Sequence, residues 1–370
     1  MLAPIHFVRH QVDLFDNSGA LSIASSPEIE LALAAAAPVF IGVSGGKDSQ
    51  ALSYRTIAYL DEVGHSGYRY LIHADLGRIE WRESLPVCER IARRTGLELI
   101  VVRRRAGGLI ERWQSRWEAN CRRYQNLDCV TLVMPWSSAV WRLCTSELKT
   151  AQIASEIRRR HPTGSVISAT GIRREESPSR ARRPVSCQEP KLSRKTGAGY
   201  AWNPILEWTR DEVLHYVGEA GDSLHEAYTR YQSTRVSCTF CVLASLHDLR
   251  SATLCADNVP VYRELVDLEI RSTYSFQNTR WLGDVSPDLL DAGMRAALAE
   301  AKERAAARAS AEASIPRHMM FEKGRPSAIP SREDATRLAV ARRAVSEAVG
   351  ISAGYTEPDE VIERYRLLMG

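Results

Sequence analysis

The sequence predicts an α/β protein, built on a doubly wound parallel sheet and followed by a helical C-terminal appendage. Four short apolar segments have the length and composition of buried strands, at residues 38–43, 69–74, 97–103 and 165–170. Patterns of helical period lie between them, at residues 48–63, 82–95 and 147–160. Strands that alternate with helices favour a parallel sheet with helices on both faces. Ligands bind to such sheets at the carboxyl ends of the strands.

The pattern divides the chain into three parts. Residues 1–37 form an N-terminal helical lead-in, residues 38–255 hold the predicted strands and the polar motifs, and residues 256–370 form a mainly helical C-terminal region. Residues 171–200 contain few apolar and many basic residues, so we expect them to form a mobile loop. Long helices are expected in the C-terminal region, at residues 293–314, 332–348 and 357–368.

Composition sets broad limits on the class of protein. The 370 residues are 44% hydrophobic and 25% charged, which is typical of a globular protein. No apolar stretch reaches the length of a membrane span, and the N-terminus lacks the basic and apolar segments of a signal peptide. We therefore expect a cytoplasmic protein without a membrane partner, whose eight cysteines are reduced, metal-bound or catalytic. The net charge of +4 is too small to indicate a nucleic-acid partner by itself.

The most informative motif is SGGKDS, which follows the first apolar segment and precedes a helical pattern. A strand, a glycine turn and a helix start make an anion site, because backbone N–H groups and the helix dipole face the ligand. The glycines let the backbone approach a phosphate closely. The motif lacks the spacing that defines the common P-loop. Its expected nucleotide-binding residues are Ser44, Gly45, Gly46, Lys47, Asp48 and Ser49.

SGGKDS resembles the PP-loop of the adenine-nucleotide alpha-hydrolase superfamily, which has a Rossmann-like (HUP) fold. These enzymes split ATP between the α and β phosphates. The resemblance implies that ATP and Mg²⁺ are cofactors and that Lys47 and Asp48 are catalytic. Asp75, in a turn with Gly77 after the second apolar segment, would help to hold Mg²⁺ or orient the phosphates. A helix cap or a simple turn is an equally good interpretation of Asp75.

A second motif, GIRREESPSR at residues 171–180, resembles the G-x-R-x-x-E-S-x-x-R signature of the phosphoadenosine-phosphosulfate (PAPS) reductase-like branch. The resemblance implies that Arg173 and Arg180 clamp a polyphosphate or a sulfur oxyanion, which guanidinium groups bind in bidentate fashion. Glu176 would orient these arginines. Gly171 and Ser177 complete the expected nucleotide-binding set, and a solvated run of charge is the alternative.

Cysteines form a third set of candidate residues. WRLCTSELK, which contains Cys144, resembles the R-x-C-T-x-x-L-K block of the same branch, and VSCTFC contains a C-x-x-C pair. Four thiolates are what a [4Fe–4S] cluster needs. Zinc, a redox pair and unligated thiols are the alternatives. The expected cluster ligands are Cys144, Cys238, Cys241 and Cys255, with Cys187, Cys129 and Cys121 as alternatives for the fourth.

Taken in order, these motifs resemble the PAPS reductase-like family, and most of all the DndC-like ATPases of DNA phosphorothioation. The resemblance implies that ATP is cleaved to AMP and pyrophosphate. A substrate oxygen would attack the α phosphate, and a sulfur nucleophile would then displace AMP. A cysteine desulfurase would be the sulfur donor. The expected activity is therefore that of an ATP-dependent adenylylating enzyme in sulfur transfer.

Two other functions stay open at this point. Reduction of PAPS or adenylyl sulfate is the first. Such reductases usually lack a Lys-Asp pair like Lys47–Asp48, and they end with a nucleophilic cysteine. The last four residues of this chain, LLMG, contain no cysteine. A non-catalytic nucleotide-binding subunit of a complex is the second. Residues 171–195 hold eight Lys or Arg against three Glu, so nucleic acid is a candidate substrate or partner. No sequence-reading motif is visible.

Overall fold

The computed structural model describes residues 21–370. The N-terminal residues that lack a signal-peptide pattern, and much of the expected lead-in, lie outside this range. The chain forms two compact units, each assembled from separate stretches. Within the described residues, the first unit comprises residues 21–74, Glu83–Val102 and Ile153–Thr229, and the second comprises Asp75–Arg82, Arg103–Gln152 and Arg230–Gly370. The boundaries predicted after residues 37 and 255 stay predictions.

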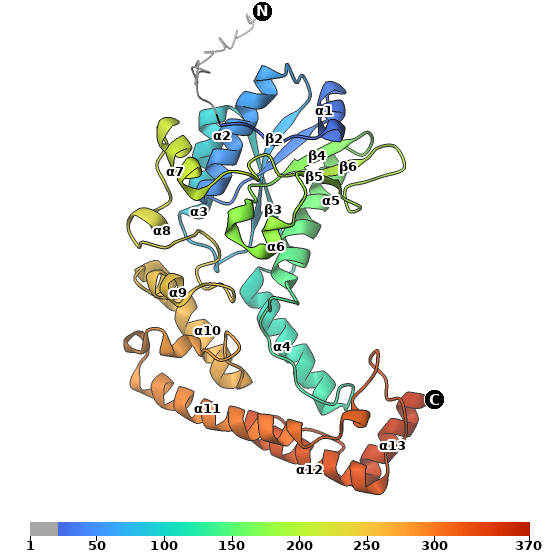
Figure 1. Cartoon of the computed structure of the whole chain (residues 1–370). Coiled ribbons are helices and arrows are strands. Elements are labelled where there is room, and N and C mark those ends of the chain that lie inside the picture. The colour runs from blue at the N-terminus through green and yellow to red at the C-terminus, as the bar shows by residue number, and fades with distance from the viewer. Residues whose placement is uncertain (1–20) are drawn as a thin grey trace, which may run out of the picture. The chain divides into compact units, whose positions relative to one another are not determined.

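The first unit is built around a sheet that has six strands within the described residues, in the order β3-β2-β1-β4-β6-β5 (Figure 1). β1 pairs in parallel with β2 and β4, β4 pairs in parallel with β6, and β5 runs antiparallel to β6. This mainly parallel sheet confirms the predicted fold class. The strands are β1 (Val39–Gly42), β2 (Arg69–Asp75), β3 (Glu98–Arg103), β4 (Val166–Ala169), β5 (Ser186–Gln188) and β6 (Gly199–Trp202).

Helices cover both faces of this sheet. Successive side chains of a strand point to opposite faces, so the partners of neighbouring strand residues show what covers each face. Val39 and Ile41 of β1 belong to a core that also contains residues of α1, α2, α3 and α7, whereas Phe40 belongs to a core shared with α5. Both sides of the central strand are thus buried, as a doubly wound sheet requires. These helices are α1 (Pro27–Ala34), α2 (Lys47–Glu62), α3 (Ser84–Thr95), α5 (Ala151–Arg160) and α7 (Arg210–Glu219).

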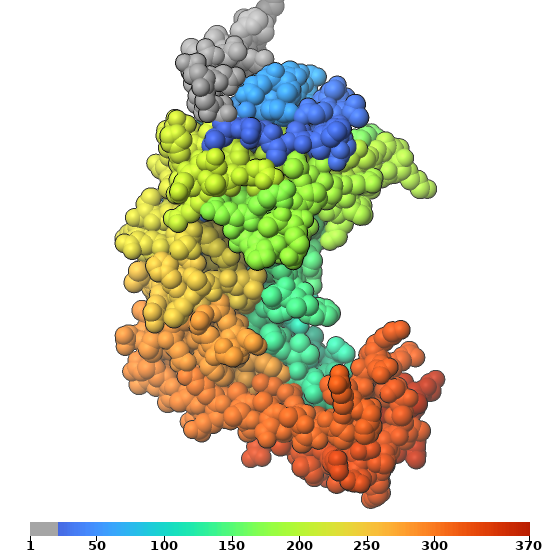
Figure 2. Space-filling model, viewed as in Figure 1, coloured from blue at the N-terminus to red at the C-terminus, as the bar shows by residue number. Residues whose placement is uncertain are grey.

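The expectation of a mobile loop over residues 171–200 was wrong. This stretch contains the helical turn η2 (Arg174–Glu176), the short helix α6 (Pro178–Ala181), β5 and the start of β6. Ser177 caps α6, since its hydroxyl accepts the N–H of Arg180 at 3.3 Å. Strands this short carry too few apolar residues to stand out from a basic background. The segment between β5 and β6 projects from the surface of the unit (Figure 2).

The second unit is helical, which confirms the helices expected at the end of the chain. α11 and α12 pack side by side (Figure 1). No helix within residues 21–370 is long and apolar enough to cross a membrane. The remaining elements are α4 (Leu109–Gln125), the π-helical turn η1 (Cys144–Thr150), α8 (Glu226–Thr229, in the first unit), α9 (Leu246–Thr253), η3 (Ala256–Asn258), α10 (Val259–Ser272), η4 (Leu282–Asp284), η5 (Pro287–Leu289), α11 (Ala292–Ala313), η6 (Arg317–Met319), α12 (Arg332–Val349) and α13 (Pro358–Met369).

Candidate functional site

The SGGKDS motif forms the loop between β1 and α2. Gly45 has φ +77°, and a Cβ atom there would lie 2.8 Å from the carbonyl oxygen of Ser84, so only glycine fits. The Ser49 hydroxyl donates to the Gly46 carbonyl at 2.8 Å and accepts the Ser44 N–H at 3.2 Å, which fixes the loop. Gly46 is the N-cap of α2 and supplies no capping side chain. The N-terminus of this helix is therefore suited to an anion.

The charged residues of the loop are paired, and Lys47 is buried. Lys47 is only 4% exposed, and its Nζ lies 3.1 Å from Oδ2 of Asp48. Arg173, also 4% exposed, reaches Oδ1 of Asp48 with its Nε at 2.6 Å and Oε2 of Glu175 with Nη1 at 2.6 Å. Burial works to lower the pKa of Arg173, but these carboxylates outweigh it and raise the pKa. Asp48 thus links the lysine of the first motif to the arginine of the second.

The rest of the arginine motif packs against the same loop. Oε2 of Glu176 accepts the N–H of Arg173 at 2.9 Å and forms an ion pair with Arg180. A Cβ atom on Gly171 would lie 2.9 Å from the carbonyl oxygen of Asp48, which places the two chain segments in close contact. The structure therefore brings Gly171 and Arg173 to the PP-loop motif. In this arrangement the guanidinium of Arg173 holds carboxylates, and its predicted role as an oxyanion clamp stays a prediction.

Sequence reasoning missed a segment that contacts this loop, residues 222–228. The N–H of Lys47 donates to Oη of Tyr228 at 3.4 Å, and Nζ of Lys47 lies 5.4 Å from the centre of the Tyr228 ring. His225 is fully buried, and its Nδ1 accepts the N–H of Ala227 at 3.0 Å. Burial, together with the nearby charge of Arg90, lowers the pKa of His225 to about 4. His225 is therefore neutral near pH 7 and acts as an acceptor at Nδ1.

Asp222 fastens this segment to α2 and α3. Its carboxylate accepts hydrogen bonds from Oη of Tyr54 at 2.7 Å, Nε2 of Gln50 at 2.8 Å and Nε of Arg90 at 2.8 Å. Burial would raise the pKa of Asp222, but these three hydrogen bonds more than offset it and lower the pKa. The segment that carries Tyr228 is consequently held rigidly beside the loop. No sequence pattern signalled it, because its partners lie more than a hundred residues away.

Asp75 belongs to the second unit and makes the contacts of a turn residue. Its Oδ1 accepts the N–H of Gly77 at 2.6 Å, and its Oδ2 accepts Nε of Arg103 at 3.0 Å. The hydrogen bond and charge of Asp75 raise the pKa of Arg103. These contacts match the turn interpretation, and a role for Asp75 with Mg²⁺ stays a prediction.

Three of the predicted cluster cysteines influence one another within the second unit. Cys144 begins the turn η1, and Cys238 forms a β-bridge with Glu80. Burial raises the pKa of the Cys238 thiol, Lys149 opposes this effect, and the charges of Cys241 and Cys144 add to it. Cys144 and Cys241 thus both lie near Cys238.

Cys241 differs from Cys238 in its hydrogen bonds. Its Sγ accepts the N–H of Leu243 at 3.4 Å and lies 3.6 Å from Nη2 of Arg235. Cys255 is buried at the end of α9, with its N–H bonded to Ala252. Over residues 21–370, no group of three or more His, Cys, Asp or Glu side chains is arranged to hold a metal ion. The predicted set of four ligands, and Cys255 in particular, stays a prediction.

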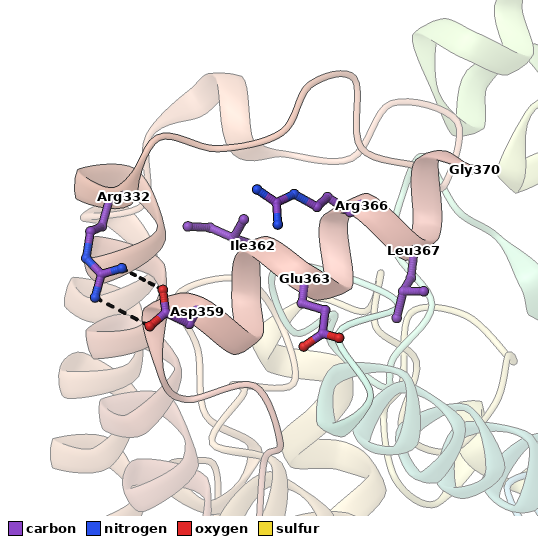
Figure 3. A pocket seen from close by; sticks show the side chains of 7 residues that line it. All are labelled: Arg332, Asp359, Ile362, Glu363, Arg366, Leu367 and Gly370. Atoms are coloured by element: carbon purple, nitrogen blue, oxygen red, sulfur yellow. Dashed lines mark hydrogen bonds and ion pairs between the residues drawn. The ribbon is translucent and has the colours of Figure 1, made fainter.

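A surface hollow of about 880 Å³ lies elsewhere in the second unit, along α13 (Figure 3). Arg332 closes one end by pairing with Asp359, with Nη1 and Oδ1 at 2.6 Å. None of the residues predicted from the sequence lies in its lining. The lining consists of Arg332, Asp359, Ile362, Glu363, Arg366, Leu367 and Gly370.

Comparison with known families decides the relationship of the chain. The sequence profile of the phosphoadenosine phosphosulfate reductase domain matches residues 38–244, more than half of the chain. The chain belongs to this family. The PAPS reductase family lies in the PP-loop superfamily. The resemblance of SGGKDS to the PP-loop of that superfamily is therefore confirmed. No curated protein sequence matches the chain.

Solved structures resemble the chain only weakly. It is similar to phosphoadenylyl-sulfate (PAPS) reductase from Candida auris in its phosphate complex, with 14% identity and a TM-score of 0.37 over 58% of this chain and 88% of that one. It is also similar to FMN adenylyltransferase from Candida glabrata in complex with FAD and inorganic pyrophosphate. The identity is 15% and the TM-score is 0.35, over 55% of this chain and 55% of that one. A third similar structure is the U34-tRNA thiolase NcsA from Methanococcus maripaludis with its [4Fe–4S] cluster. The identity is 13% and the TM-score is 0.31, over 69% of this chain and 82% of that one. Likenesses this distant decide nothing about the chemistry of the site.

Proposed function

We propose that this member of the PAPS reductase family cleaves ATP to AMP and pyrophosphate and adenylylates an acceptor for sulfur transfer. The observation that carries the proposal is the intact PP-loop motif at the N-terminus of α2. There, Lys47 pairs with Asp48 at 3.1 Å, and Asp48 in turn holds Arg173 at 2.6 Å. A chain that only reduced a sulfonucleotide would have no need of a lysine placed for the phosphates of ATP.

Each residue of the loop has a role in this proposal. The start of α2 would bind phosphate oxygens, because backbone N–H groups and the positive end of the helix dipole face that end of the helix. Lys47 would stabilise the negative charge that grows on the leaving pyrophosphate. Asp48 would orient Lys47 and Arg173 toward the nucleotide. Mg²⁺, when bound, would neutralise charge on the phosphates and position them, as it does in other ATP-cleaving sites.

The cysteines of the second unit are proposed to hold a [4Fe–4S] cluster. The donor set fits in kind, since Cys144, Cys238 and Cys241 are all free thiols of the second unit. Cys255 is proposed as the fourth ligand, and its position just after α9 is the only support for this choice. When bound, the cluster would supply a coordination site for sulfur. Zinc ligation and free thiols remain the competing accounts of these residues.

The acceptor and the sulfur donor are proposed by class. Nucleic acid is the proposed acceptor. Residues 171–195 contain more Lys and Arg than Glu, and clustered positive charge binds phosphate backbones. Part of that charge is already engaged, since Arg173 and Arg180 pair with carboxylates. A cysteine desulfurase is the proposed donor of sulfur.

Two assays on the same preparation test the proposal. The full chain is incubated with ATP and Mg²⁺, and with PAPS plus a dithiol reductant, and the products are separated. We expect AMP and pyrophosphate in the first assay and no sulfite in the second. Sulfite formation would favour the reductase alternative. Tight ATP binding without any cleavage would favour the non-catalytic subunit.

A further inference from the structure

One tryptophan of the second unit is held out in solvent. The side chain of Trp141 is 72% exposed, whereas six of the other seven tryptophans, all in the described part of the chain, are buried. Val140, the residue before it, is 87% exposed. So large an apolar ring contributes little to the fold when it stays in water, because its stabilising effect comes from burial. Trp141 is therefore available to a ligand.

The exposed ring is presented by a fixed turn. The N–H of Ser138 donates to the carbonyl oxygen of Trp141 at 3.1 Å, and Oγ of Ser138 accepts the N–H of Trp141 at 3.0 Å. Before the turn, Trp136 is fully buried and its Nε1 donates to the carbonyl oxygen of Tyr274 at 3.3 Å. After the turn, Leu143 is buried. Both ends of the turn are thus anchored, so a ligand pays little to order it.

Arginines gather around the helical turn η1, which comes next in the chain. Nε and Nη2 of Arg112 donate to the carboxylate of Glu147 at 2.7 and 3.1 Å. This hydrogen bonding lowers the pKa of Glu147, burial opposes it, and the nearby charges of Arg112, Arg104 and Arg116 add to the lowering. Nη1 of Arg116 also donates to the carbonyl oxygen of Trp136 at 2.9 Å. Three guanidinium groups thus lie near one carboxylate, which leaves a surplus of positive charge.

Arg142 adds a guanidinium group that is not engaged. It follows Trp141 in the chain and is exposed, and its side chain has no hydrogen-bond or ion-pair partner among residues 21–370. Its carbonyl oxygen accepts the N–H groups of Thr145 at 2.9 Å and Ser146 at 3.0 Å, which fixes the backbone around Cys144. An exposed ring and a free guanidinium on one anchored segment supply a flat surface for a base and a cation for a phosphate.

This combination favours an unpaired nucleotide over a duplex. The bases of a duplex stack on one another and present only their edges in the grooves. A ring on a protein surface can stack only on a base that lies outside such a stack. A protein partner could cover Trp141, but it would not need the surplus of arginine charge around η1.

We propose that Trp141 stacks on an unpaired base of a nucleic acid, whose phosphates the arginines around η1 bind. The bound nucleotide would then lie at the segment that carries Cys144. The inference rests on nucleic acid as the proposed acceptor, and it specifies the form of that acceptor as a single-stranded segment of DNA or RNA. It is independent of ATP cleavage.

The test measures equilibrium binding of labelled nucleic acids to the full chain by fluorescence anisotropy. The probes are a DNA strand without self-complementarity, the RNA strand of the same sequence and the corresponding DNA duplex. The variants are Trp141→Ala, which removes the ring, Trp141→Phe, which keeps an aromatic surface, and Arg142→Met, which removes the free charge. Tyr68→Ala is the matched control, because Tyr68 is an aromatic residue of the first unit with a similar exposure of 68%.

We expect at least one of the two strands to bind more tightly than the duplex. Trp141→Ala should weaken binding of that strand about tenfold, Trp141→Phe less than about threefold, and Tyr68→Ala not at all. Arg142→Met should reduce the slope of log affinity against log salt concentration by about 0.7, the value for one phosphate contact with a single strand. Binding of the duplex should be the same in the wild type and in Trp141→Ala.

The strand whose affinity falls in Trp141→Ala identifies the source of the nucleotide as DNA or RNA. Wild-type affinity of both strands in Trp141→Ala, or an equal loss in Tyr68→Ala, would overturn the inference and leave nucleic acid standing as the proposed acceptor. Absence of binding by every probe would overturn the inference and the acceptor together, while the assays of AMP and pyrophosphate would still decide ATP cleavage.

Discussion

The two units hold their functional residues by different means. In the first unit the PP-loop motif is held by charge, because Asp48 pairs with both Lys47 and Arg173, which are buried. In the second unit the segment that begins at Cys241 is held by the neutral amide of Gln277, which donates to three of its carbonyl groups. The first support consists of paired charges, and the second is a neutral amide. The difference suits the nucleotide site proposed for the first unit and the cysteine site proposed for the second.

The units also differ in their buried titratable anchors. His225 supports the segment beside the PP-loop motif, and burial lowers its pKa to about 4. Glu269 accepts three backbone N–H groups of the turn that carries Gln277, and burial raises its pKa to about 8 although these hydrogen bonds favour the charged form. Each anchor is thus neutral near pH 7. Their responses to pH are opposite in sign, which gives a way to separate the units experimentally.

The largest expected effect comes from removing the lysine of the PP-loop motif. Lys47→Met should lower the rate of AMP formation by about 10²–10³, the range found when one group that stabilises developing charge is removed. Lys323→Met, which removes an exposed lysine of the second unit, is the control and should keep wild-type activity. Equal rates in the two variants would show that Lys47 takes no part in catalysis.

Loss of the buried arginine should cost stability in the first unit. Arg173→Met removes one of the two cations that pair with Asp48 and leaves Lys47 as the other, and breaking a buried ion pair costs on the order of 3 kcal/mol. The control is Arg159→Met, because Arg159 forms an exposed pair with Glu156 that is worth less than about 1 kcal/mol. Denaturant unfolding measures both free energies of unfolding. A cost below that of the control would mean that the buried pair is not a structural link.

The buried anchors predict opposite pH responses. Between about pH 6.5 and 4 the unfolded chain binds a proton at His225 that the folded chain does not, so the free energy of unfolding falls as the pH falls. Between about pH 4.5 and 8 the folded chain keeps a proton on Glu269 that the unfolded chain loses, so the free energy of unfolding falls as the pH rises. His225→Asn should flatten the acid limb and Glu269→Gln the alkaline limb, each by about 1–2 kcal/mol.

Denaturant unfolding followed across pH 4 to 9, the range that brackets both windows, measures these slopes. If either variant flattens the limb assigned to the other residue, the assignment of the anchors to the two units is wrong.

The smallest effect is expected at Tyr228. Tyr228→Ala removes both the ring beside Lys47 and the hydroxyl that accepts its N–H, and should weaken ATP binding about fivefold, which corresponds to roughly 1 kcal/mol. Tyr228→Phe keeps the ring and should weaken binding by less than about twofold. Equilibrium binding of ATP measures both. Equal losses in the two variants would assign the effect to the hydroxyl alone.

The sequence predicted those parts of the molecule that are local in the chain. SGGKDS carries its own glycine turn and helix start, so its place between β1 and α2 followed from residues within a few positions. The long C-terminal helices were also predictable from composition. β5 and β6 were missed because three or four residues carry little periodicity, and their pairing depends on β4.

The supports of both sites could not be read from the sequence. Tyr228 meets Lys47 across 181 positions, and Gln277 meets Cys241 across 36. Neither lies in a motif, and each acts through hydrogen bonds that only the folded chain brings together. The motifs therefore indicated the candidate groups for the proposed chemistry, while the residues that contact and hold them appeared only in the structure.

The central claim is that the PP-loop motif cleaves ATP between the α and β phosphates. The most direct measurement is the ³¹P nuclear magnetic resonance spectrum of ATP and Mg²⁺ incubated with the full chain and an acceptor nucleic acid, with Lys47→Met in parallel. The account predicts that AMP and pyrophosphate signals grow with the wild type and not with the variant. Growth of ADP and phosphate signals instead would contradict it, because the bond cleaved would then be the one between the β and γ phosphates.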